Sequence, residues 1–186
     1  MEKRIRNLFC LLMGLLGFKS LTAQAEDLFL CSDTFPGESQ DATYKDCIDL
    51  LSWSWGMSNS STTHTGGGGG GAGVASVNDL SVVKYVDKSS PDLMLHTANG
   101  KVFPKVELFM RGNCPDACTQ PYYKLKMENV LVSSISTGGS EDTGRPTESV
   151  SFNFSKVEWC YTPLLKDSTP GTEICRAWDI AANQEP

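Results

Sequence analysis

Cysteine is the residue type in this sequence whose number and spacing point to definite chemistry, and that chemistry is disulfide formation. The chain of 186 residues contains seven cysteines, of which Cys10 lies in an apolar N-terminal segment. The others form an even set, as expected for a disulfide framework in an exported protein. They are Cys31, Cys47, Cys114, Cys118, Cys160 and Cys175.

The strand pattern around these cysteines narrows the choice of pairing. Two pairs lie on neighbouring predicted strands that flank a Pro-Gly turn. If such neighbours are antiparallel, Cys31 could face Cys47, and Cys160 could face Cys175. The four predicted strands span residues 28–31, 47–55, 157–161 and 174–178.

The remaining two cysteines share the short loop CPDAC and can close it locally. Cys114 and Cys118 have CxxxC spacing, which differs from the CxxC of thiol oxidoreductases. A zinc site needs clustered thiolates or histidines. The chain has only His64 and His96, and neither lies near a cysteine pair in the sequence. We therefore predict no metal and no cofactor.

Catalytic motifs are not recognisable either. A serine nucleophile needs a histidine base that is held by a carboxylate, and neither histidine stands in such a motif. The glycine run 66–71 is not followed by the Lys-Ser/Thr of a phosphate-binding loop. Glu141 and Asp142 are adjacent in a Gly/Ser/Thr loop, which indicates a solvated turn. We predict no catalytic residues and no enzyme; an exported hydrolase that uses His64 or His96 is a distant alternative.

Residues 1–25 have the three parts of a secretory signal peptide. Lys3, Arg4 and Arg6 form a basic start, and residues 8–18 form an apolar run too short to span a bilayer. Ala23-Gln24-Ala25 is typical of a cleavage site. We expect cleavage there and location in the periplasm or outside the cell; an uncleaved anchor or a misplaced start codon are the alternatives.

The charge of the chain argues against a nucleic-acid partner. The predicted leader carries four basic residues and one acidic residue, so its removal changes the net charge from −6 to −9. Phosphate recognition requires clustered Lys and Arg, whereas here these residues are scattered singly. We expect a solvated acidic surface and no membrane insertion after cleavage.

Beyond the leader, the pattern predicts one mainly β domain over residues 26–186. Residues 106–110, 123–127 and 150–161 alternate between apolar and polar, as half-buried strands do, and residues 74–86 read as a further strand. The alternation changes phase at Leu50-Leu51 and near Ser155-Lys156, which predicts a bulge or bend at each point.

One helix is predicted directly after the strand at residues 74–86. Ser90 is a suitable N-cap, Pro91 suits the first helical position, and Asn99-Gly100 is a suitable stop. The apolar residues of this helix are expected to form its buried side. They are Leu93, Met94, Leu95 and Ala98.

The segment 50–73 reads LLSWSWGMSNSSTTHTGGGGGGAG. Trp53 and Trp55 alternate with Ser52 and Ser54, so one side of this strand is aromatic and the other is hydroxylic. The glycines that follow cannot hold a regular element, because glycine loses the most chain entropy on ordering. This segment resembles the Hcp proteins, the tube subunits of the bacterial type VI secretion system.

Further motifs carry the same resemblance across residues 27–178, which is nearly all of the chain after the leader. In chain order they are PGES (36–39), NDLSVVKYVDKSSPDLM (78–94), ENVLVSSISTGGS (128–140) and RPTESVSFNFSKVE (145–158). The resemblance implies a β-barrel of two antiparallel sheets with one short flanking α-helix. It also implies hexameric rings that stack into a tube and hold small effectors in their lumen.

The resemblance assigns roles to two parts of the chain. The extended glycine-rich loop 58–73, with His64, Gly66 and Gly71, corresponds to a loop that contacts neighbouring subunits or the next ring. The strand before it lines the lumen, so Leu51, Ser52 and Ser54 are expected to face cargo. The implied partners are further copies of the chain, small effectors and the spike protein. A free surface loop and ordinary solvent exposure are the alternatives.

The predicted leader and cysteines depart from the usual members of that family, which lack a cleaved signal, are cysteine-poor and assemble in the cytoplasm. Two hypotheses follow. The chain is a ring-forming, disulfide-stapled Hcp-like protein exported by a Gram-negative bacterium, or it is an Hcp-derived periplasmic or extracellular binding module that forms no tubes.

Overall fold

The computed structural model describes residues 26–59, 74–112, 120–141, 144–165 and 169–186. It contains ten strands and one helix in these ranges. They are β1 (Asp27–Cys31), β2 (Ile48–Ser54), β3 (Met57–Asn59), β4 (Ala75–Val77), β5 (Leu80–Tyr85), α2 (Ser90–Asn99), β6 (Val102–Arg111), β7 (Tyr123–Gly138), β8 (Thr147–Asn153), β9 (Lys156–Tyr161) and β10 (Ile174–Asp179).

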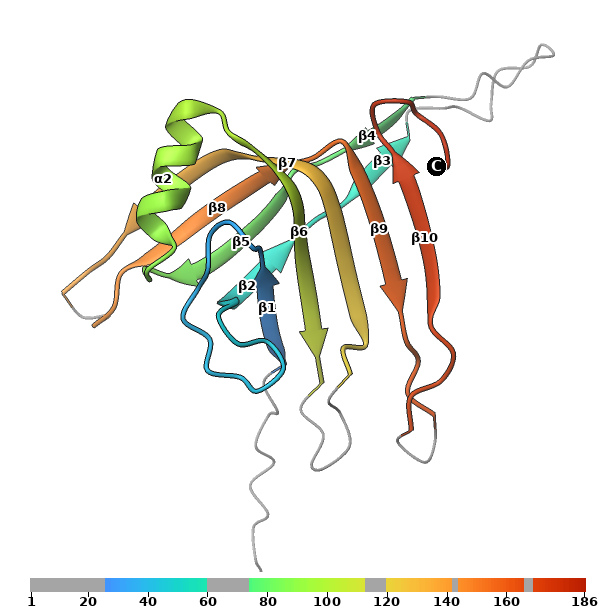
Figure 1. Cartoon of the computed structure of the whole chain (residues 1–186), viewed down its shortest axis with the longest axis horizontal. Coiled ribbons are helices and arrows are strands. Elements are labelled where there is room, and N and C mark those ends of the chain that lie inside the picture. The colour runs from blue at the N-terminus through green and yellow to red at the C-terminus, as the bar shows by residue number, and fades with distance from the viewer. Residues whose placement is uncertain (1–25, 60–73, 113–119, 142–143, 166–168) are drawn as a thin grey trace, which may run out of the picture.

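Six antiparallel strands close into a barrel (Figure 1). The order of the sheet is β10-β9-β7-β6-β1-β2-β5-β8, and β8 pairs back to β7. Closure leaves β9 and β10 as an extension outside the barrel. The predicted mainly β barrel with one short helix is confirmed. Its wall belongs to one continuous sheet, and β3 and β4 form a separate two-stranded sheet beside it.

The barrel interior is filled by the apolar half of each alternating strand. Along β6, Val106, Leu108 and Met110 are buried, while Glu107 and Phe109 are more exposed. Leu125 and Met127 of β7 behave in the same way. The period of two that the sequence displays therefore separates the core from the outer surface.

Both predicted changes of phase correspond to irregularities in the strands. The pairing of β2 with β5 shifts register between Leu50 and Ser52, so Leu51 is a bulged residue, and it is 45% exposed. The long strand β7 pairs with β9 along its first half and with β8 along its second half. The chain bends between β8 and β9, where the Ser155 amide donates to the Glu128 carbonyl over 3.1 Å.

The helix ends as predicted, but its start and its buried side differ from the prediction. Gly100 adopts a left-handed conformation with φ 64°, which only glycine tolerates easily, and closes the helix. The N-cap is Ser89 rather than Ser90. The hydroxyl of Ser90 is instead buried in a polar network, so it does not cap the helix.

Only Leu93 of the predicted apolar side is buried, and it is joined by His96. Met94, Leu95 and Ala98 are exposed. Positions three apart lie on one face of a helix, and α2 packs against the barrel chiefly through its contacts with β7. The prediction was wrong because it assumed that every apolar residue of a short helix faces the core.

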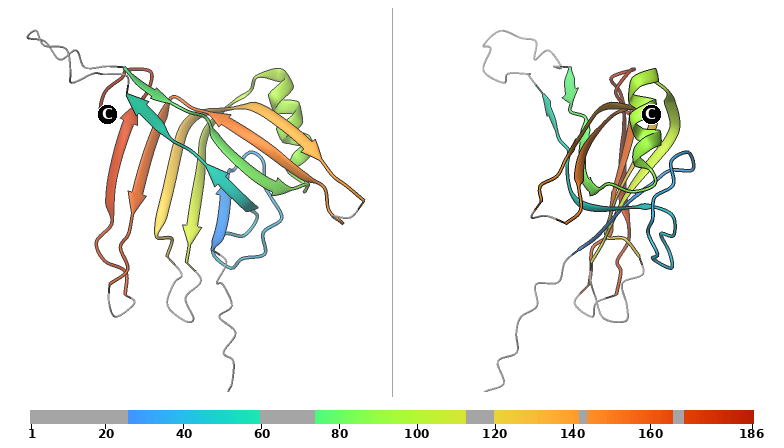
Figure 2. Two further views of the ribbon diagram at one scale, coloured as in Figure 1. Left: turned by 180° about the vertical axis from the view of Figure 1, so that it is seen from behind. Right: turned by 90° about the vertical axis from the view of Figure 1, so that its left-hand side faces the viewer.

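The segment 74–86 forms two strands rather than the predicted one. Asn78 and Asp79 separate β4 from β5, and the Asn78 amide donates to the Gly56 carbonyl over 3.0 Å. The bend lets β4 pair with β3, with Met57 opposite Val77. The resulting ribbon projects from the barrel and carries the ends of the glycine-rich loop (Figure 2).

Candidate functional site

The outer side of the wall made by β2, β5, β8 and β7 presents aligned serines. Ser54 lies opposite Ser81, Ser81 opposite Ser151, and Ser151 opposite Ser134. The Ser81 and Ser151 hydroxyl oxygens are 3.1 Å apart and share a hydrogen bond. One serine from each of four neighbouring strands thus forms a continuous row across the wall.

A second row runs parallel to the first. Ser52 lies opposite Val83, Val83 opposite Ser149, and Ser149 opposite Ser136. Each member is two residues from a member of the first row, so both rows lie on the same side of the sheet. We call the seven hydroxyl residues the serine face. They are Ser52, Ser54, Ser81, Ser134, Ser136, Ser149 and Ser151.

The predicted cargo residues belong to this surface or lie beside it. Ser52, Ser54 and the bulged Leu51 are all exposed. On the other side of β2, Trp53 packs parallel to Tyr123 with ring centroids 6.0 Å apart. The two tryptophans pack against the core, so the aromatic and hydroxylic sides separate as the sequence indicated.

Sequence reasoning missed the five serines of β5, β7 and β8. A signal was present, because Ser134 and Ser136 lie in the motif SIS, and Ser149 and Ser151 lie in the motif SVS. Such alternation shows that two serines share one side of a strand. It does not reveal which strands are neighbours in the sheet. Only the pairing of neighbouring strands brings the serines of separate strands together into one surface.

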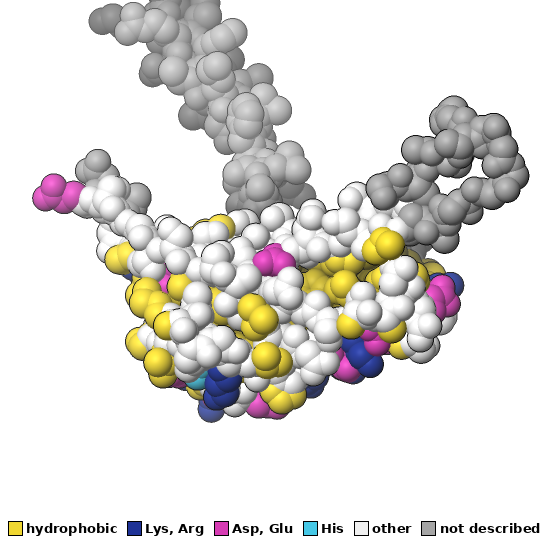
Figure 3. All heavy atoms as spheres, turned by 90° about the horizontal axis from the view of Figure 1, so that it is seen from above, with side chains coloured by type: hydrophobic (Ala, Val, Ile, Leu, Met, Phe, Trp, Pro, Cys, Tyr) yellow, Lys and Arg dark blue, Asp and Glu magenta, His cyan; other side chains and the backbone are white. Residues whose placement is uncertain are grey.

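Within the described residues, charged side chains lie at the two ends of this surface. At one end, the Asp79 carboxylate accepts hydrogen bonds from the side-chain amide of Asn153 over 2.8 Å and from the Ser133 hydroxyl. At the other, the Arg145 guanidinium lies 4.7 Å from the centre of the Tyr85 ring. In the view from above (Figure 3), much of the described surface is white, the colour of the backbone and of uncharged polar side chains, and acidic and basic side chains are scattered.

A shallow pocket adjoins the Arg145 end. It has a volume of about 340 Å³ and places Leu51 of the bulge beside one cation and three carboxylates. The charged residues that line it are Glu38, Asp49, Asp87 and Arg145. These four charged residues lie beside Leu51, at the edge of the serine face.

A buried ionic network lies directly behind the serine face. Lys84 and Glu148 are opposite one another on β5 and β8, and their side chains are 1% and 0% exposed. The Lys84 ammonium is 2.6 Å from Glu148 and 2.8 Å from Asp87. The Ser90 hydroxyl donates to Glu148 over 2.7 Å. This network ties the first turn of α2 to the wall, and it was not predicted from the sequence.

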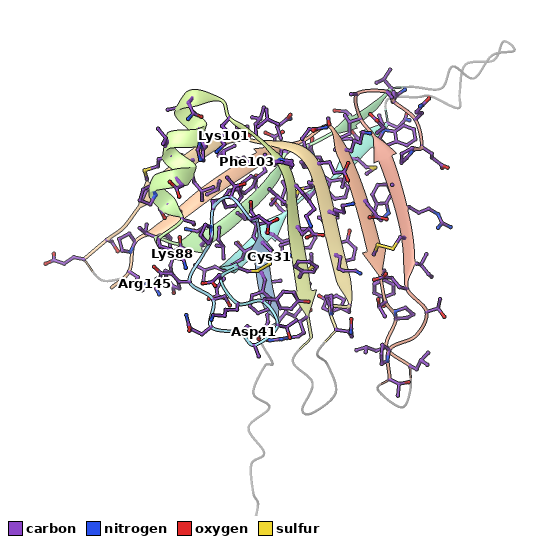
Figure 4. The ribbon with its side chains drawn as sticks, in the orientation of Figure 1. Cys31, Asp41, Lys88, Lys101, Phe103 and Arg145 are labelled. Atoms are coloured by element: carbon purple, nitrogen blue, oxygen red, sulfur yellow. A yellow bond between two sulfur atoms is a disulfide. The ribbon has the colours of Figure 1, made fainter. Side chains whose placement is uncertain are left out.

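Two disulfides join the predicted pairs. Cys31 is bonded to Cys47 with Cα atoms 4.5 Å apart, and Cys160 to Cys175 with Cα atoms 4.1 Å apart (Figure 4). The Glu158 carboxylate lies within 4.8 Å of the second pair of sulfurs. Because both sulfurs are already bonded to each other, this trio does not form a metal site in the oxidised protein.

The loop closed by the first disulfide has its own ionic anchor. Arg111 bonds to Asp41 in that loop and, over 2.8 Å, to Asp27 of β1. The hydrogen bond to the Arg111 guanidinium, opposed in part by burial, lowers the pKa of Asp41 to about 2. Figure 4 labels Asp41 in this loop and Cys31 at its start.

The described histidine has a packing role. The His96 ring meets the Phe103 ring edge-on at 5.2 Å, and its Nδ1 lies 3.5 Å from the Asn99 side-chain amide.

No helix within the described ranges is both long and apolar enough to cross a bilayer.

Several predicted residues lie outside the described residues. They are the leader 1–25 with Cys10, the loop residues His64, Gly66 and Gly71, and the pair Cys114 and Cys118.

One family of known proteins matches most of the chain. The family described as "Type VI secretion system effector, Hcp" matches residues 29–161. The chain is 45% identical over 160 residues to protein hcp1 of Pseudomonas aeruginosa, which covers 86% of this chain and 98% of that protein.

Two solved structures share the fold. A type six secretion system protein has a TM-score of 0.81 and 29% identity, covering 87% of this chain and 100% of its own. Hcp1 from Salmonella typhimurium has a TM-score of 0.72 and 34% identity, covering 87% and 99%. The fold, the family match and these relatives lead to one conclusion: the chain belongs to the Hcp family of type VI secretion system proteins.

Proposed function

We propose that this chain assembles into hexameric rings whose lumen is lined by the serine face, and that these rings stack and carry small effectors of a type VI system. The observation that supports this most strongly is the serine face itself. Four strands carry aligned hydroxyls, and the described charged residues Asp79 and Arg145 lie at the two ends of this surface. An exposed surface so poor in charge, yet fully able to hydrogen-bond, suits an aqueous channel.

The chemistry of hydroxyl groups fits transient retention of cargo. A serine hydroxyl both donates and accepts, so it can match polar groups on different effectors. Each such bond replaces one to water and contributes little net free energy. Many weak contacts can retain an effector without immobilising it, whereas unpaired charges would discriminate strongly between effectors.

The glycine-rich loop 58–73 is the proposed contact to the adjacent ring, with His64, Gly66 and Gly71 in it. The position of the strands that flank it supports this proposal. The described strands at its two ends, β3 and β4, form a ribbon that projects away from the barrel, so the loop starts where a neighbour can reach it.

The solution mass of residues 26–186 tests the ring. Light scattering after size exclusion, under oxidising and then reducing conditions, is expected to give a hexamer when the disulfides are intact. A monomer at high concentration in both conditions would rule out the ring.

The lumen assignment is tested separately by adding charge. Ser136→Arg and Ser149→Arg are expected to keep the hexamer mass but to abolish co-purification of a small type VI effector. Ser76→Arg, an exposed serine on the β3–β4 ribbon, is the matched control and should leave co-purification intact. Retained cargo in both lumen variants would contradict the assignment.

A second function is favoured by the disulfides. Two described disulfides fit an exported protein, and the predicted leader suggests transport to the periplasm or beyond after cleavage. In that case the barrel acts as a binding module that forms no tubes. A stable monomer that binds a partner would favour this alternative, and N-terminal sequencing of the exported protein would test the cleavage.

A further inference from the structure

Strand β10 is the least integrated strand of the main sheet. It lies outside the closed barrel and pairs only with β9 in the described structure. None of its six residues is buried, whereas Val157 and Cys160 of β9 are. In Figure 1 it forms the free edge of the sheet. Its attachment therefore depends on few contacts.

Apart from the backbone ladder, apolar packing, exposed ion pairs and one covalent bond hold β10 and the residues next to it. Trp178 and Ile180 pack partly against the core, and the Ile180 amide donates to the Ser155 carbonyl over 2.8 Å. Lys156 is 3.3 Å from Asp179, but its side chain is 44% exposed, and ion pairs of this exposure contribute little to stability. The remaining contact is the Cys160–Cys175 disulfide, which is covalent. Because β10 is an edge strand, its backbone is hydrogen-bonded to a neighbour on one side only, and the disulfide is its one covalent fastening to β9.

A reductant can reach this disulfide. Cys175 is partly exposed and lines a surface pocket of about 240 Å³ together with Glu158, Arg176 and Glu185. A dithiol can attack the Cys175 sulfur as a thiolate and form a mixed disulfide while Cys160 leaves as a thiolate. The second thiol of the reductant then displaces Cys175. Two protein thiols and one oxidised dithiol result.

The other disulfide has a different setting. The loop between Cys31 and Cys47 is also held by Phe35, which is fully buried in the barrel core. Backbone hydrogen bonds also hold the loop. The Gly37 amide donates to the Asp46 carbonyl over 2.7 Å, and the Ser39 amide donates to the Cys47 carbonyl over 3.0 Å. Reduction there removes one of several independent anchors.

We infer that the Cys160–Cys175 disulfide is a redox latch. When it is oxidised, it fastens β10 to β9. When it is reduced, β10 and the C-terminal residues separate from β9 while the six-stranded barrel stays folded. Separation exposes the hydrogen-bonding edge of β9, which is then open to pairing with another strand. The edge is covered in an oxidising compartment and uncovered in a reducing one.

Hydrogen exchange measured by mass spectrometry tests the latch. The probes are oxidised residues 26–186, the same protein reduced with a phosphine, and the variants C160S/C175S and C31S/C47S. In the reduced protein and in C160S/C175S, the amides of residues 174–179 should exchange faster by on the order of tenfold or more. The amides of β5 and β8 should keep their protection.

The matched variant C31S/C47S should leave exchange in residues 174–179 at the rate of the oxidised protein. Mass spectrometry of partly reduced protein should also find Cys160–Cys175 open before Cys31–Cys47. Unchanged exchange of β10 in C160S/C175S would overturn the latch. Equal loss of protection in β5, β8 and β10 would overturn it too, because the disulfide would then hold the whole fold rather than one strand.

Discussion

The Lys84 ammonium lies 2.6 Å from the Glu148 carboxylate, and both side chains are withdrawn from solvent. One oxygen of this carboxylate accepts from both Lys84 and Ser90, while the other has no protein partner among the described residues. The pair lies between the strands of the serine face and the first turn of α2. A buried charge pair in this position fixes how the helix meets the wall.

Removing one partner of this pair is expected to destabilise the folded protein. Lys84→Met should lower the free energy of unfolding by about 3–5 kcal/mol, because it leaves buried carboxylates without their cation. Urea denaturation measures the change. The double variant K84M/E148L should recover much of the loss, because no buried charge at these two positions remains.

The control is Lys88→Met. Lys88 pairs with Asp46, but these side chains are 45% and 54% exposed, so the change should stay within about 0.5 kcal/mol. Equal losses for the Lys84 and Lys88 variants would contradict the role of burial.

Gly37 is required by space rather than by backbone conformation. A methyl group added there would lie 2.4 Å from the backbone carbonyl oxygen of Cys47, and backbone cannot move aside cheaply. Gly37→Ala should destabilise the protein by about 1–3 kcal/mol or more. Gly138→Ala, where a methyl group meets nothing within 4 Å, is the matched control and should be nearly neutral in the same denaturation measurement.

Asp41 should contribute a defined pH dependence. Its pKa is lowered from 3.8 to about 2 by the Arg111 guanidinium, so the folded state favours the ionised form. The stabilisation is therefore complete above about pH 4 and is lost as the pH falls through 2. Carboxyl chemical shifts in an NMR titration report the pKa of Asp41 directly.

Arg111→Met is the corresponding variant. Loss of the guanidinium should return the pKa of Asp41 towards 3.8 and should flatten the acid dependence of stability between pH 4 and 2. An Asp41 pKa that stays near 2 in this variant would show that the backbone amides of Thr43 and Tyr44, rather than Arg111, set it.

The Cys31–Cys47 disulfide should stabilise the whole fold through the unfolded chain. It joins residues 16 apart in sequence, and loops of this length contribute roughly 3 kcal/mol when they are closed. C31S/C47S should therefore unfold at lower denaturant with the same native circular dichroism spectrum. An unchanged midpoint would contradict the entropic contribution.

The sequence by itself determined the features that depend on local pattern. Apolar alternation identified most strands, and its changes of phase located the bulge at Leu51 and the bend near Ser155. The Pro-Gly turns indicated which cysteines could meet, because each turn joins antiparallel neighbours. The helix stop at Gly100 followed from the backbone freedom of glycine. Each of these signals lies within a few residues of the feature that it specifies.

Tertiary structure alone decided the features that depend on neighbours distant in sequence. The serine face exists because barrel closure places Ser54, Ser81, Ser151 and Ser134 in one row. Lys84 looks like a surface lysine in the sequence, and only its position opposite Glu148 makes it a buried one. Period two tells which side of a strand a residue takes, whereas strand order and register decide what it meets there.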